Sequence, residues 1–396
     1  MSKLQDLIRE LCPDGVEYKK LRDICKLNRG TRVVRNDLSK DGEFEVYQNS
    51  LTPLGYYDKS NYPAYTAFII SAGAAGEIGF TEKPIWAADD CLCLTCPDNI
   101  SSKYVYYCLL NNKLFLSSRV RKASVPRLAR TAVEQFEIPI PPLPVQEEIV
   151  RILDHFTNLA AELQAELQAR KEQYEYYRNK LLTFGKNAER IEWKRLEDVL
   201  HSIRTGLNPR KFFKLNTPDA TSYYVTIREF NGGNLTFTDS TDRINETARI
   251  LCNNRSNLEY NDVLFSGTGT IGETYVIDNI PSNWNIKEGV YSLKPKIHII
   301  LPKYLKYILS QSDIKASYLK LAEGGTVKSI SMRKLGNFPI PVPSLSEQQR
   351  IVSILDKFEA LVNDLSEGLP AEIAAVQEQY EYYRNKLLSF PKLAVA

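Results

Sequence analysis

Two long stretches of the chain place apolar residues alternately four and three positions apart. The first runs from Ile149 to Leu181 with Arg170 as an interruption, and the second runs from Ile351 to Leu387. This heptad spacing predicts two long amphipathic helices, each with a seam for a partner helix. The seam positions are Ile149, Leu153, Phe156, Ala160, Leu163, Leu167, Tyr174, Tyr177 and Leu181 in the first stretch, and Ile351, Leu355, Phe358, Val362, Leu365, Leu369, Ile373, Val376, Tyr380, Tyr383 and Leu387 in the second.

The second stretch is longer than the first. Its seam spans 36 positions against 32 in the first, which inserts about one helical turn into the repeat. Gly368 and Pro370 fall at the insertion. Because proline cannot donate the helical hydrogen bond, we expect a kink or a short break there.

The chain is an internal duplication. Residues 172–182 read EQYEYYRNKLL and are identical to residues 378–388, and residues 136–156 align without a gap on residues 338–358. A two-copy chain predicts a pseudo-twofold arrangement in which its two helices, each about 50 Å long, pair antiparallel. The alternative is a homodimer in which each helix pairs with one from a second chain.

A globule precedes each helix. Short segments rich in aromatic and β-branched residues, separated by turn residues, predict a mostly-β globule with a few helices in each copy. The expected strands include residues 68–71, 85–88, 92–95, 223–227, 263–266 and 275–278, and the expected helices are residues 103–116 and 303–319. The fold class is therefore α+β.

Proline runs close each globule, at residues 139–144 and 339–343. They predict extended connectors into the helices, with Ser346 as the N-cap of the second. We place the first globule at residues 1–140, the first spacer helix at 141–185, the second globule at 186–340 and the second spacer helix at 341–396. Residues 1–11 predict a small amphipathic helix that packs on the end of the second long helix.

Composition narrows the class of protein. The 396 residues carry a net charge of only +3, so a basic surface has to be local. No apolar run approaches the ~20 residues that span a bilayer. Seven cysteines in a chain of this length do not form a disulfide framework, and their odd number argues for reduced thiols. We expect reduced thiols and a cytoplasmic location.

Two motifs with known chemistry have simpler structural interpretations. Residues 267–272 read GTGTIG, which fits a dinucleotide-binding loop, but a strand is expected to follow instead of a helix. We interpret it as a glycine turn between strands; the alternative is a loop whose N–H groups approach a DNA phosphate. Cys91, Cys93 and Cys96 form CxCxxC without a second cluster nearby, so we expect Cys91 and Cys93 on one face of a strand and no zinc.

The chain carries none of the catalytic motifs that we sought. It lacks the phosphate-binding loop, the zinc-protease and esterase motifs and the signature of amino-methyltransferases. Asp89 and Asp90 have no visible partners for acid–base chemistry. The chain is therefore predicted to be non-catalytic, with neither a cofactor nor a metal of its own.

Basic residues gather at corresponding places in the two copies. Residues 115–133 contain five cations and no acid. Such groups are candidates for contacts with DNA phosphates, and their arginines and lysines for contacts with bases. The candidates are Arg29, Arg32, Arg35, Arg119, Arg121, Lys122, Arg127 and Arg130 in the first copy, and Arg204, Arg210, Lys211, Lys214, Lys328, Arg333 and Lys334 in the second.

The duplicated pattern resembles the specificity subunit of type I restriction–modification systems. The resemblance covers nearly the whole chain and is most specific at residues 138–154, at residues 340–356 and in the two EQYEYYRNKLL segments. It implies two target-recognition domains that each read one half of a bipartite, asymmetric DNA site. It also implies an antiparallel coiled coil that sets the spacer between the half-sites.

The resemblance further implies partners that carry the chemistry. Two methyltransferase subunits would dock on this chain and methylate adenine at N6 with S-adenosylmethionine. A motor–nuclease restriction subunit that uses ATP and Mg²⁺ would join some complexes. The alternatives are a stand-alone sequence-specific DNA-binding regulator, an enzyme with its own chemistry and a coiled-coil adaptor for proteins alone.

Overall fold

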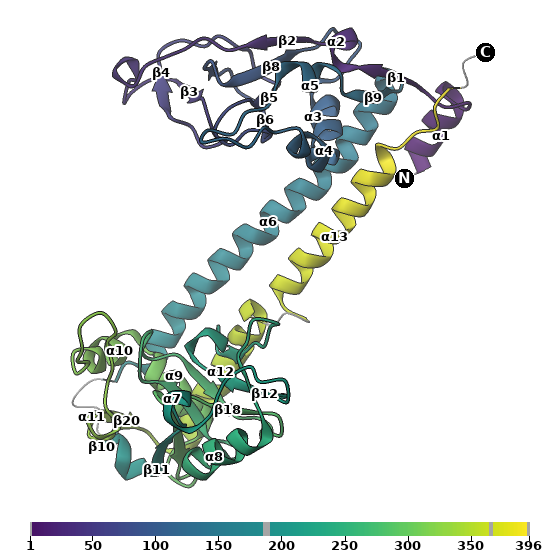
Figure 1. The fold of residues 1–396 in the computed structure, drawn as a ribbon. Coiled ribbons are helices and arrows are strands. Elements are labelled where there is room, and N and C mark those ends of the chain that lie inside the picture. Colours follow the sequence, from purple (N-terminus) through teal and green to yellow (C-terminus); the bar gives the residue numbers. More distant parts are fainter. Residues whose placement is uncertain (1, 185–190, 364–366, 394–396) are drawn as a thin grey trace. The chain divides into compact units, whose positions relative to one another are not determined.

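The computed structural model describes residues 2–184, 191–363 and 367–393. The chain divides into two compact units (Figure 1). Unit 1 comprises Met1–Gln164 with Ile373–Ala396, and unit 2 comprises Ala165–Glu372. Each unit thus holds one globule together with parts of both predicted long helices. The four boundaries placed from the sequence stay a prediction.

Unit 1 contains a four-stranded antiparallel sheet in the order β2-β8-β5-β6. A three-stranded sheet, β4-β3-β7, and a two-stranded sheet, β1-β9, accompany it. The strands are β1 (Glu17–Lys20), β2 (Lys26–Arg29), β3 (Phe44–Tyr47), β4 (Gly55–Tyr57), β5 (Thr66–Ile70), β6 (Ile78–Thr81), β7 (Trp86–Ala87), β8 (Cys91–Thr95) and β9 (Glu137–Ile140).

Unit 2 repeats this plan with a four-stranded sheet in the order β11-β19-β16-β17. It adds the sheets β15-β12-β18, β13-β14 and β10-β20. The strands are β10 (Glu192–Arg195), β11 (Leu200–Thr205), β12 (Ser222–Val225), β13 (Phe230–Asn231), β14 (Asn234–Leu235), β15 (Arg243–Ile244), β16 (Val263–Ser266), β17 (Thr274–Val276), β18 (Trp284–Ile286), β19 (Val290–Pro295) and β20 (Pro339–Val342).

Helices complete both units, and the mixture of strands and helices confirms the α+β class. The α-helices are α1 (Ser2–Leu11), α2 (Leu21–Ile24), α3 (Ser102–Asn111), α4 (Lys113–Ser118), α5 (Arg130–Glu134), α6 (Leu143–Leu182), α7 (Pro209–Phe212), α8 (Glu246–Ser256), α9 (Pro302–Ser310), α10 (Ser312–Leu319), α11 (Met332–Gly336), α12 (Leu345–Asn363) and α13 (Leu369–Leu387). Short 3₁₀ helices lie at Arg35–Asp37, Leu196–Val199 and Ile227–Glu229.

The proline runs are extended only in part: residues 139–140 and 339–342 belong to strands β9 and β20, whereas Pro144 lies in the first turn of α6. β9 pairs antiparallel with β1, and β20 pairs with β10 in the same manner. Proline is compatible with these positions because each two-stranded sheet consists of edge strands. The first and last strands of each globule therefore lie side by side.

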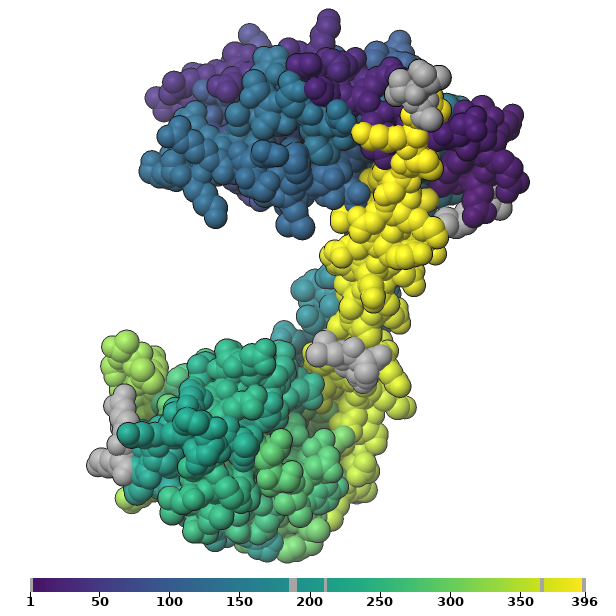
Figure 2. All heavy atoms as spheres, turned by 45° about the vertical axis from the view of Figure 1, so that its right-hand side comes forward, coloured from purple at the N-terminus to yellow at the C-terminus, as the bar shows by residue number. Residues whose placement is uncertain are grey.

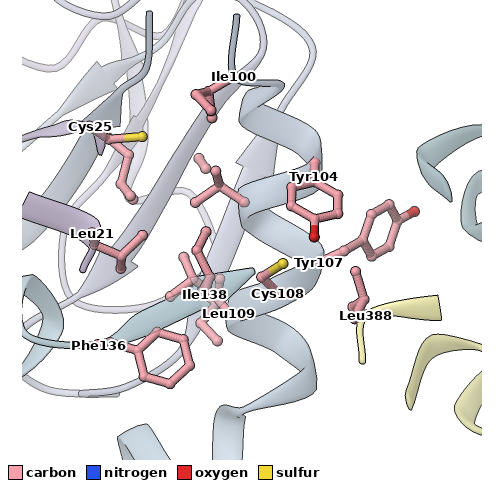
Figure 3. Close-up of a cluster of buried hydrophobic side chains, with 14 of the residues drawn as sticks. Leu21, Cys25, Ile100, Tyr104, Tyr107, Cys108, Leu109, Phe136, Ile138 and Leu388 are labelled. Atoms are coloured by element: carbon pink, nitrogen blue, oxygen red, sulfur yellow. The ribbon is translucent and has the colours of Figure 1, made fainter. Parts of the chain in front are cut away.

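A long helix packs on the core of each globule. In unit 1, α3 and β9 contribute to a buried cluster that also includes Leu388 (Figure 3). The Tyr107 hydroxyl donates to Asp154 Oδ1 on α6 at 2.6 Å. Tyr307 donates to Asp356 on α12 at the same distance in unit 2. A tyrosine–aspartate contact thus fixes each globule to its helix, and Tyr307 makes a second bond to Glu359 at 2.8 Å.

The predicted helix pair is formed within the chain, and it is antiparallel in each unit. In unit 1 the start of α6 and the end of α13 meet at one core, and Phe156 stacks on Tyr383 at 5.4 Å between ring centroids. In unit 2 the end of α6 meets the start of α12, and Tyr177 stacks on Phe358 at 5.5 Å. Apart from Leu365, which lies outside the described residues, the seam positions are buried or partly buried.

The second long helix is broken, as the glycine and proline predicted. It consists of α12 and α13, and Gly368 is buried just before α13 begins. The predicted cap is wrong by two residues. Ser344 Oγ accepts from the backbone N–H of Glu347 at 3.3 Å, whereas Ser346 lies in the first turn of α12. The helix begins at Leu345, one residue after Ser344, and β20 ends at Val342.

The N-terminal helix packs on the end of the second long helix, as expected. Leu4 of α1 shares one buried cluster with Leu387 and Leu388. Val16 also forms a β-bridge with Lys392. Figure 2 shows the yellow C-terminal part of unit 1 beside its purple N-terminal part. Lys3 Nζ of α1 lies 3.0 Å from Glu148 Oε2 on α6.

Glu148 makes the attachment of α1 sensitive to acid. Its side chain is only 2% exposed, and Arg151 donates to it at 2.6 Å. Hydrogen bonds from Arg151 and Lys3 lower the pKa of Glu148 from 4.5 to about 2. The stabilisation is therefore present above the unfolded-state pKa and is lost as pH falls toward the folded-state pKa.

Replacing Glu148 by Gln should destabilise unit 1 by about 1–2 kcal/mol at pH 7, because two charge-assisted contacts are lost. Urea unfolding at several pH values measures this difference. It should shrink between about pH 5 and pH 2, as wild type loses the same charge. Glu147→Gln, at an exposed neighbouring position, is the control. A difference that stays constant down to pH 2 would contradict the ion-pair explanation.

The cysteines depart from the expectation of reduced thiols. Cys25 and Cys96 form a disulfide that joins the start of the first sheet to the end of β8. Spacing along the chain did not reveal this pair, because 71 residues separate the two cysteines. Cys91 and Cys93 share one buried cluster, as predicted, and burial raises the pKa of the Cys91 thiol to about 12.

In residues 2–184, 191–363 and 367–393, no helix combines the length and apolar character needed to cross a bilayer. Within the same ranges, no group of three or more His, Cys, Asp or Glu side chains is placed to hold a metal ion.

Candidate nucleic-acid interface

One end of each four-stranded sheet gathers loops from distant parts of the sequence. In unit 1, Arg29 pairs with Leu92, and Ile70 pairs with Cys91. The carboxyl ends of β2 and β5 therefore meet the amino end of β8. In unit 2, Thr205 of β11 and Ser266 of β16 meet the start of β19 in the same way. We call this edge the loop end of each sheet.

Hydrogen bonds lock the loops together at the loop end of unit 1. The N–H of Ser71 donates to the Asp90 carbonyl at 2.7 Å, and the N–H of Leu128 donates to the Ser71 carbonyl at 2.8 Å. Two further bonds, each between Arg121 and Arg127, close a hairpin loop that projects from this end. The loop end of unit 1 is thus built from loops of four separate parts of the first globule.

The loop end of unit 2 has the same backbone bonds with different residues. The N–H of Gly267 donates to the Gly289 carbonyl at 2.8 Å, and the N–H of Ile330 donates to the Gly267 carbonyl at 2.9 Å. Glu323 and Ser329 close a hairpin loop with two bonds at 2.8 Å. The two globules therefore share one hydrogen-bonded backbone arrangement and present different side chains on it.

The glycine-rich segments are turns at this end, as predicted. Residues 267–273 connect β16 to β17, and Gly269 and Gly272 have φ values of +80° and +96°. Gly76 has a φ of +90° in the corresponding turn of unit 1. Side chains with a Cβ rarely adopt these angles, so the glycines are explained by the turns. Contact of their N–H groups with a phosphate stays a proposal.

The structure brings three candidate arginines of unit 1 together. Arg29, Arg32 and Arg127 are exposed, and the charge of each favours the ionised form of the Asp90 carboxyl. Burial and the neighbouring Asp89 carboxylate raise the pKa of Asp90, and the three arginines oppose that rise. The loop end of unit 1 therefore carries acidic as well as basic side chains.

The other candidates of unit 1 lie on different elements. Arg121 and Lys122 belong to the projecting hairpin loop and are exposed. Arg119 caps α4 and lies 4.9 Å from the centre of the Phe115 ring. Arg130 is paired with Glu134 at 2.7 Å, and Arg35 begins a 3₁₀ helix.

The candidates of unit 2 are more dispersed. Lys328 lies in the projecting loop and accepts, through its carbonyl, a 2.9 Å bond from the N–H of Gly269. Arg204 is exposed on β11, one residue before the loop end. The rest follow the loops or flank the projecting hairpin: Lys214 is exposed after α7, Arg333 is exposed on α11, Lys334 is paired with Glu323, and the side chains of Arg210 and Lys211 on α7 lie outside what the structure describes.

Reasoning from the sequence missed two features of this surface. Asp89 and Asp90 were considered only for acid–base chemistry, whereas the charges of Arg127, Arg29 and Arg32 act on the Asp90 carboxyl in the structure. The exposed tips of the projecting loops carry valine in both copies, Val125 at 48% and Val327 at 60% exposure. The shared Ser/Thr–Val pair in otherwise different loops was the signal for this match.

Comparison with known proteins assigns the chain to a family. A family model described as the type I restriction modification DNA specificity domain matches residues 13–172 and 189–375. The chain belongs to the type I restriction–modification DNA specificity family. As a specificity subunit it contains the match twice, once in each copy of the duplication.

Relatives of this specificity subunit match along most of its length. The EcoR124I/EcoR124II specificity subunit of Escherichia coli is 37% identical over 314 residues, covering 75% of this chain and 73% of the relative. A putative type I restriction enzyme specificity subunit of Haemophilus influenzae is 32% identical over 401 residues, covering 95% and 96%. These matches support DNA specificity in a type I system over a stand-alone regulator.

Solved structures share the fold of the specificity subunit. A type I restriction–modification S subunit from M. genitalium matches with a TM-score of 0.62 and 16% identity, covering 94% of this chain and 96% of the other. A chain from a study of complex assembly in a type I system matches with a TM-score of 0.57 and 17% identity, covering 96% and 98%. Both likenesses concern the fold alone.

Proposed function

We propose that each globule of this specificity subunit reads one half of a bipartite, asymmetric DNA site through the loop end of its four-stranded sheet. The observation that supports this proposal most directly is the backbone hydrogen-bond arrangement that the loop ends of units 1 and 2 share. Gly267, Gly289 and Ile330 make the bonds of Ser71, Asp90 and Leu128, but the side chains around them differ. The shared protein backbone arrangement suits contact with the DNA sugar–phosphate backbone, which is the same at every site. The different side chains suit contact with different bases.

Charge at the loop ends supports the same proposal. The chain has a net charge of only +3, yet Arg29 ends β2 at the loop end of unit 1, Arg32 follows it closely in sequence, and Arg127 forms a β-bridge with Ala72 just after β5. Arginine bonds to phosphates and pairs with guanine edges in two-bonded geometry. The hairpin loop that follows α4 adds Arg121 and Lys122 to this surface.

The chemistry is proposed to reside on partner subunits. Two methyltransferase subunits dock on the helix pairs and methylate adenine at N6 with bound S-adenosylmethionine. A restriction subunit that uses ATP and Mg²⁺ joins some complexes. This chain sets the sequence and spacing of the site, supplies no catalytic group or cofactor, and acts in the cytoplasm. The family to which the chain belongs, and the packing of each globule on a long helix, support this assignment of DNA recognition to this chain and of catalysis to its partners.

Neutralising the arginine cluster tests the proposed interface. In the complex with methyltransferase subunits, Arg29→Ala/Arg32→Ala/Arg127→Ala should weaken DNA binding and lower the slope of log affinity against log salt by about 2–3, roughly 0.9 per lost phosphate contact. Fluorescence anisotropy at several salt concentrations measures both quantities.

The matched control removes cations from the opposite end of the same sheet. Lys26 begins β2, and Lys83 follows the end of β6, and both are exposed. Lys26→Ala/Lys83→Ala should leave affinity and salt slope near those of wild type. If both variants lost DNA affinity equally, the arginines would contribute only a general electrostatic attraction, and the loop end would not be the binding surface.

A further inference from the structure

The duplication allows the two loop ends to be compared position by position. Arg29 lies opposite Leu92 at the end of β2. Thr205 lies opposite Tyr291 at the end of β11. Leu92 and Tyr291 correspond to each other, because each also pairs with the penultimate residue of the neighbouring strand, β5 or β16. Arg29 and Thr205 therefore occupy the same position in the two globules.

Backbone contacts match two further positions of the loop ends. Asp90 corresponds to Gly289, since the carbonyl of each accepts from the N–H of the residue that follows β5 or β16. Arg127 corresponds to Ser329, since each forms one β-bridge to the second residue after that strand and another within the projecting hairpin loop. Three charged residues of unit 1 thus have uncharged counterparts in unit 2: Arg29, Asp90 and Arg127 match Thr205, Gly289 and Ser329.

Asp90 differs from the other two because an anion weakens the attraction to DNA. A duplex carries one negative charge per ~1.7 Å of its axis, so it repels a carboxylate on a surface that faces it. The Asp90 side chain is partly exposed. Within the described ranges of the chain, no residue forms a hydrogen bond or a salt bridge with its carboxylate. The carboxylate can therefore accept hydrogen bonds from a ligand.

The backbone arrangement of the loop end does not require this carboxylate. Asp90 contributes its carbonyl, which accepts from the Ser71 N–H at 2.7 Å and from the Ser71 hydroxyl at 2.9 Å. Unit 2 makes the corresponding backbone bond with Gly289, which has no side chain. A carboxylate that the fold does not need, on a surface where it opposes general attraction to DNA, indicates a role in choosing the DNA sequence.

We propose that Asp90 is a specificity-determining residue of the first globule, whose carboxylate accepts a hydrogen bond from the exocyclic amino group of one base; this inference rests on the proposed function. In the major groove that group is N4 of cytosine or N6 of adenine, the two amino bases. An ionised carboxylate only accepts hydrogen bonds, so the O6 of guanine and the O4 of thymine repel it. The first half-site should therefore contain one position that admits an amino base and excludes both keto bases, guanine and thymine.

The second globule lacks this acceptor and is expected to read its half-site by other contacts. Gly289 offers no side chain, and the Thr205 hydroxyl is already bonded within the loop end. It donates to the Val290 carbonyl at 2.9 Å and accepts from the N–H of Gly289 at 3.1 Å. A change at Asp90 should therefore alter the first half-site alone.

Replacing the carboxylate by an amide tests this role. Asp90→Asn keeps the shape and one acceptor oxygen but adds an NH₂ donor, which can bond to a keto base. The full chain is purified with methyltransferase subunits, and N6-methyladenine is mapped by sequencing on DNA with randomised half-sites. Wild type should discriminate against keto bases at one position of the first half-site, and Asp90→Asn should lower that discrimination by about tenfold. The base that wild type prefers there identifies the donor as cytosine or adenine.

The matched control makes the same replacement at the opposite end of the sheet. Asp98 is exposed and lies shortly after the end of β8. Asp98→Asn removes the same charge from unit 1 and should keep the sequence preference of wild type at every position. Asp90→Gly introduces the residue of unit 2 and is the second test variant; because it removes the acceptor altogether, it should also lower the discrimination against keto bases.

Each other outcome would contradict a defined part of the proposal. Unchanged preference at every position in both Asp90 variants would overturn the role of Asp90 and leave the proposed function intact. An equal rise in affinity for all sequences, measured by fluorescence anisotropy, would do the same, because a carboxylate that only repels DNA has that effect. Loss of all methylation in both variants, with Asp98→Asn active, would show a structural role instead. A wild-type complex that methylates no bipartite site would overturn the proposed function itself.

Discussion

Exchanging residues 1–140 for the corresponding segment of another specificity subunit should change one half of the methylated sequence completely and leave the other half unchanged. The reason is that every loop at the loop end of unit 1 comes from this segment, including the turn at Ser71 and the hairpin loop closed by Arg121 and Arg127. Sequencing of N6-methyladenine in DNA modified by the chimaera measures the outcome.

The reciprocal exchange of residues 186–340 is the control for this experiment. It should alter only the half-site that the first exchange preserved, and the two changes should combine in a double chimaera. Donor segments need apolar residues at the positions that meet Ile149 and Leu153 of α6, since these two are fully buried in the core of unit 1. If either exchange altered both half-sites, modular reading would be refuted.

Replacing the buried glutamine of either long helix should cause a large loss of stability. Gln348 of α12 is fully buried, and its Oε1 accepts from the N–H of Leu301 at 2.8 Å. Its Nε2 donates to the carbonyls of Ile299 and Pro343, both at 2.9 Å. Gln348→Leu leaves these three backbone groups without partners, which should cost about 2–4 kcal/mol.

Chemical unfolding followed by circular dichroism measures this cost, with Gln349→Leu as the control. Gln349 is the adjacent, exposed residue, and its replacement should change the free energy of unfolding by no more than about 0.5 kcal/mol. Gln146→Leu should behave like Gln348→Leu in unit 1, because Gln146 accepts from Ser101 at 2.9 Å and donates to Pro141 at 2.8 Å. Similar stability of Gln348→Leu and Gln349→Leu would show that the hydrogen bonds contribute little.

The helices could be predicted from the sequence because their signals are local. The heptad spacing placed Phe156 and Tyr383 on seams, and these rings do stack. Gly368 and Pro370 marked the break between α12 and α13. A single heptad stretch shows that a helix needs a partner but not which one. The duplication indicated that the two helices of the chain are each other's partners.

The loop ends could be predicted only in part, because strand pairing assembles them. Lists of basic residues included Arg29, Arg32 and Arg127, but also Arg130, which is paired with Glu134. Nothing along the chain showed that β2, β5 and β8 would bring Asp90 to those arginines. The Cys25–Cys96 disulfide was missed for the same reason, since its cysteines belong to segments that become neighbours only in the sheet.

The pairing of the first and last strands places the two chain ends of each globule next to each other. Glu17 lies opposite Ile140 in unit 1, and Glu192 lies opposite Val342 in unit 2, so the chain enters and leaves each globule at adjacent points. Insertions between those points, such as the β13–β14 hairpin of unit 2, leave the junction with the helix undisturbed. A globule can thus be lengthened or replaced in evolution without a change in the long helix to which it is attached.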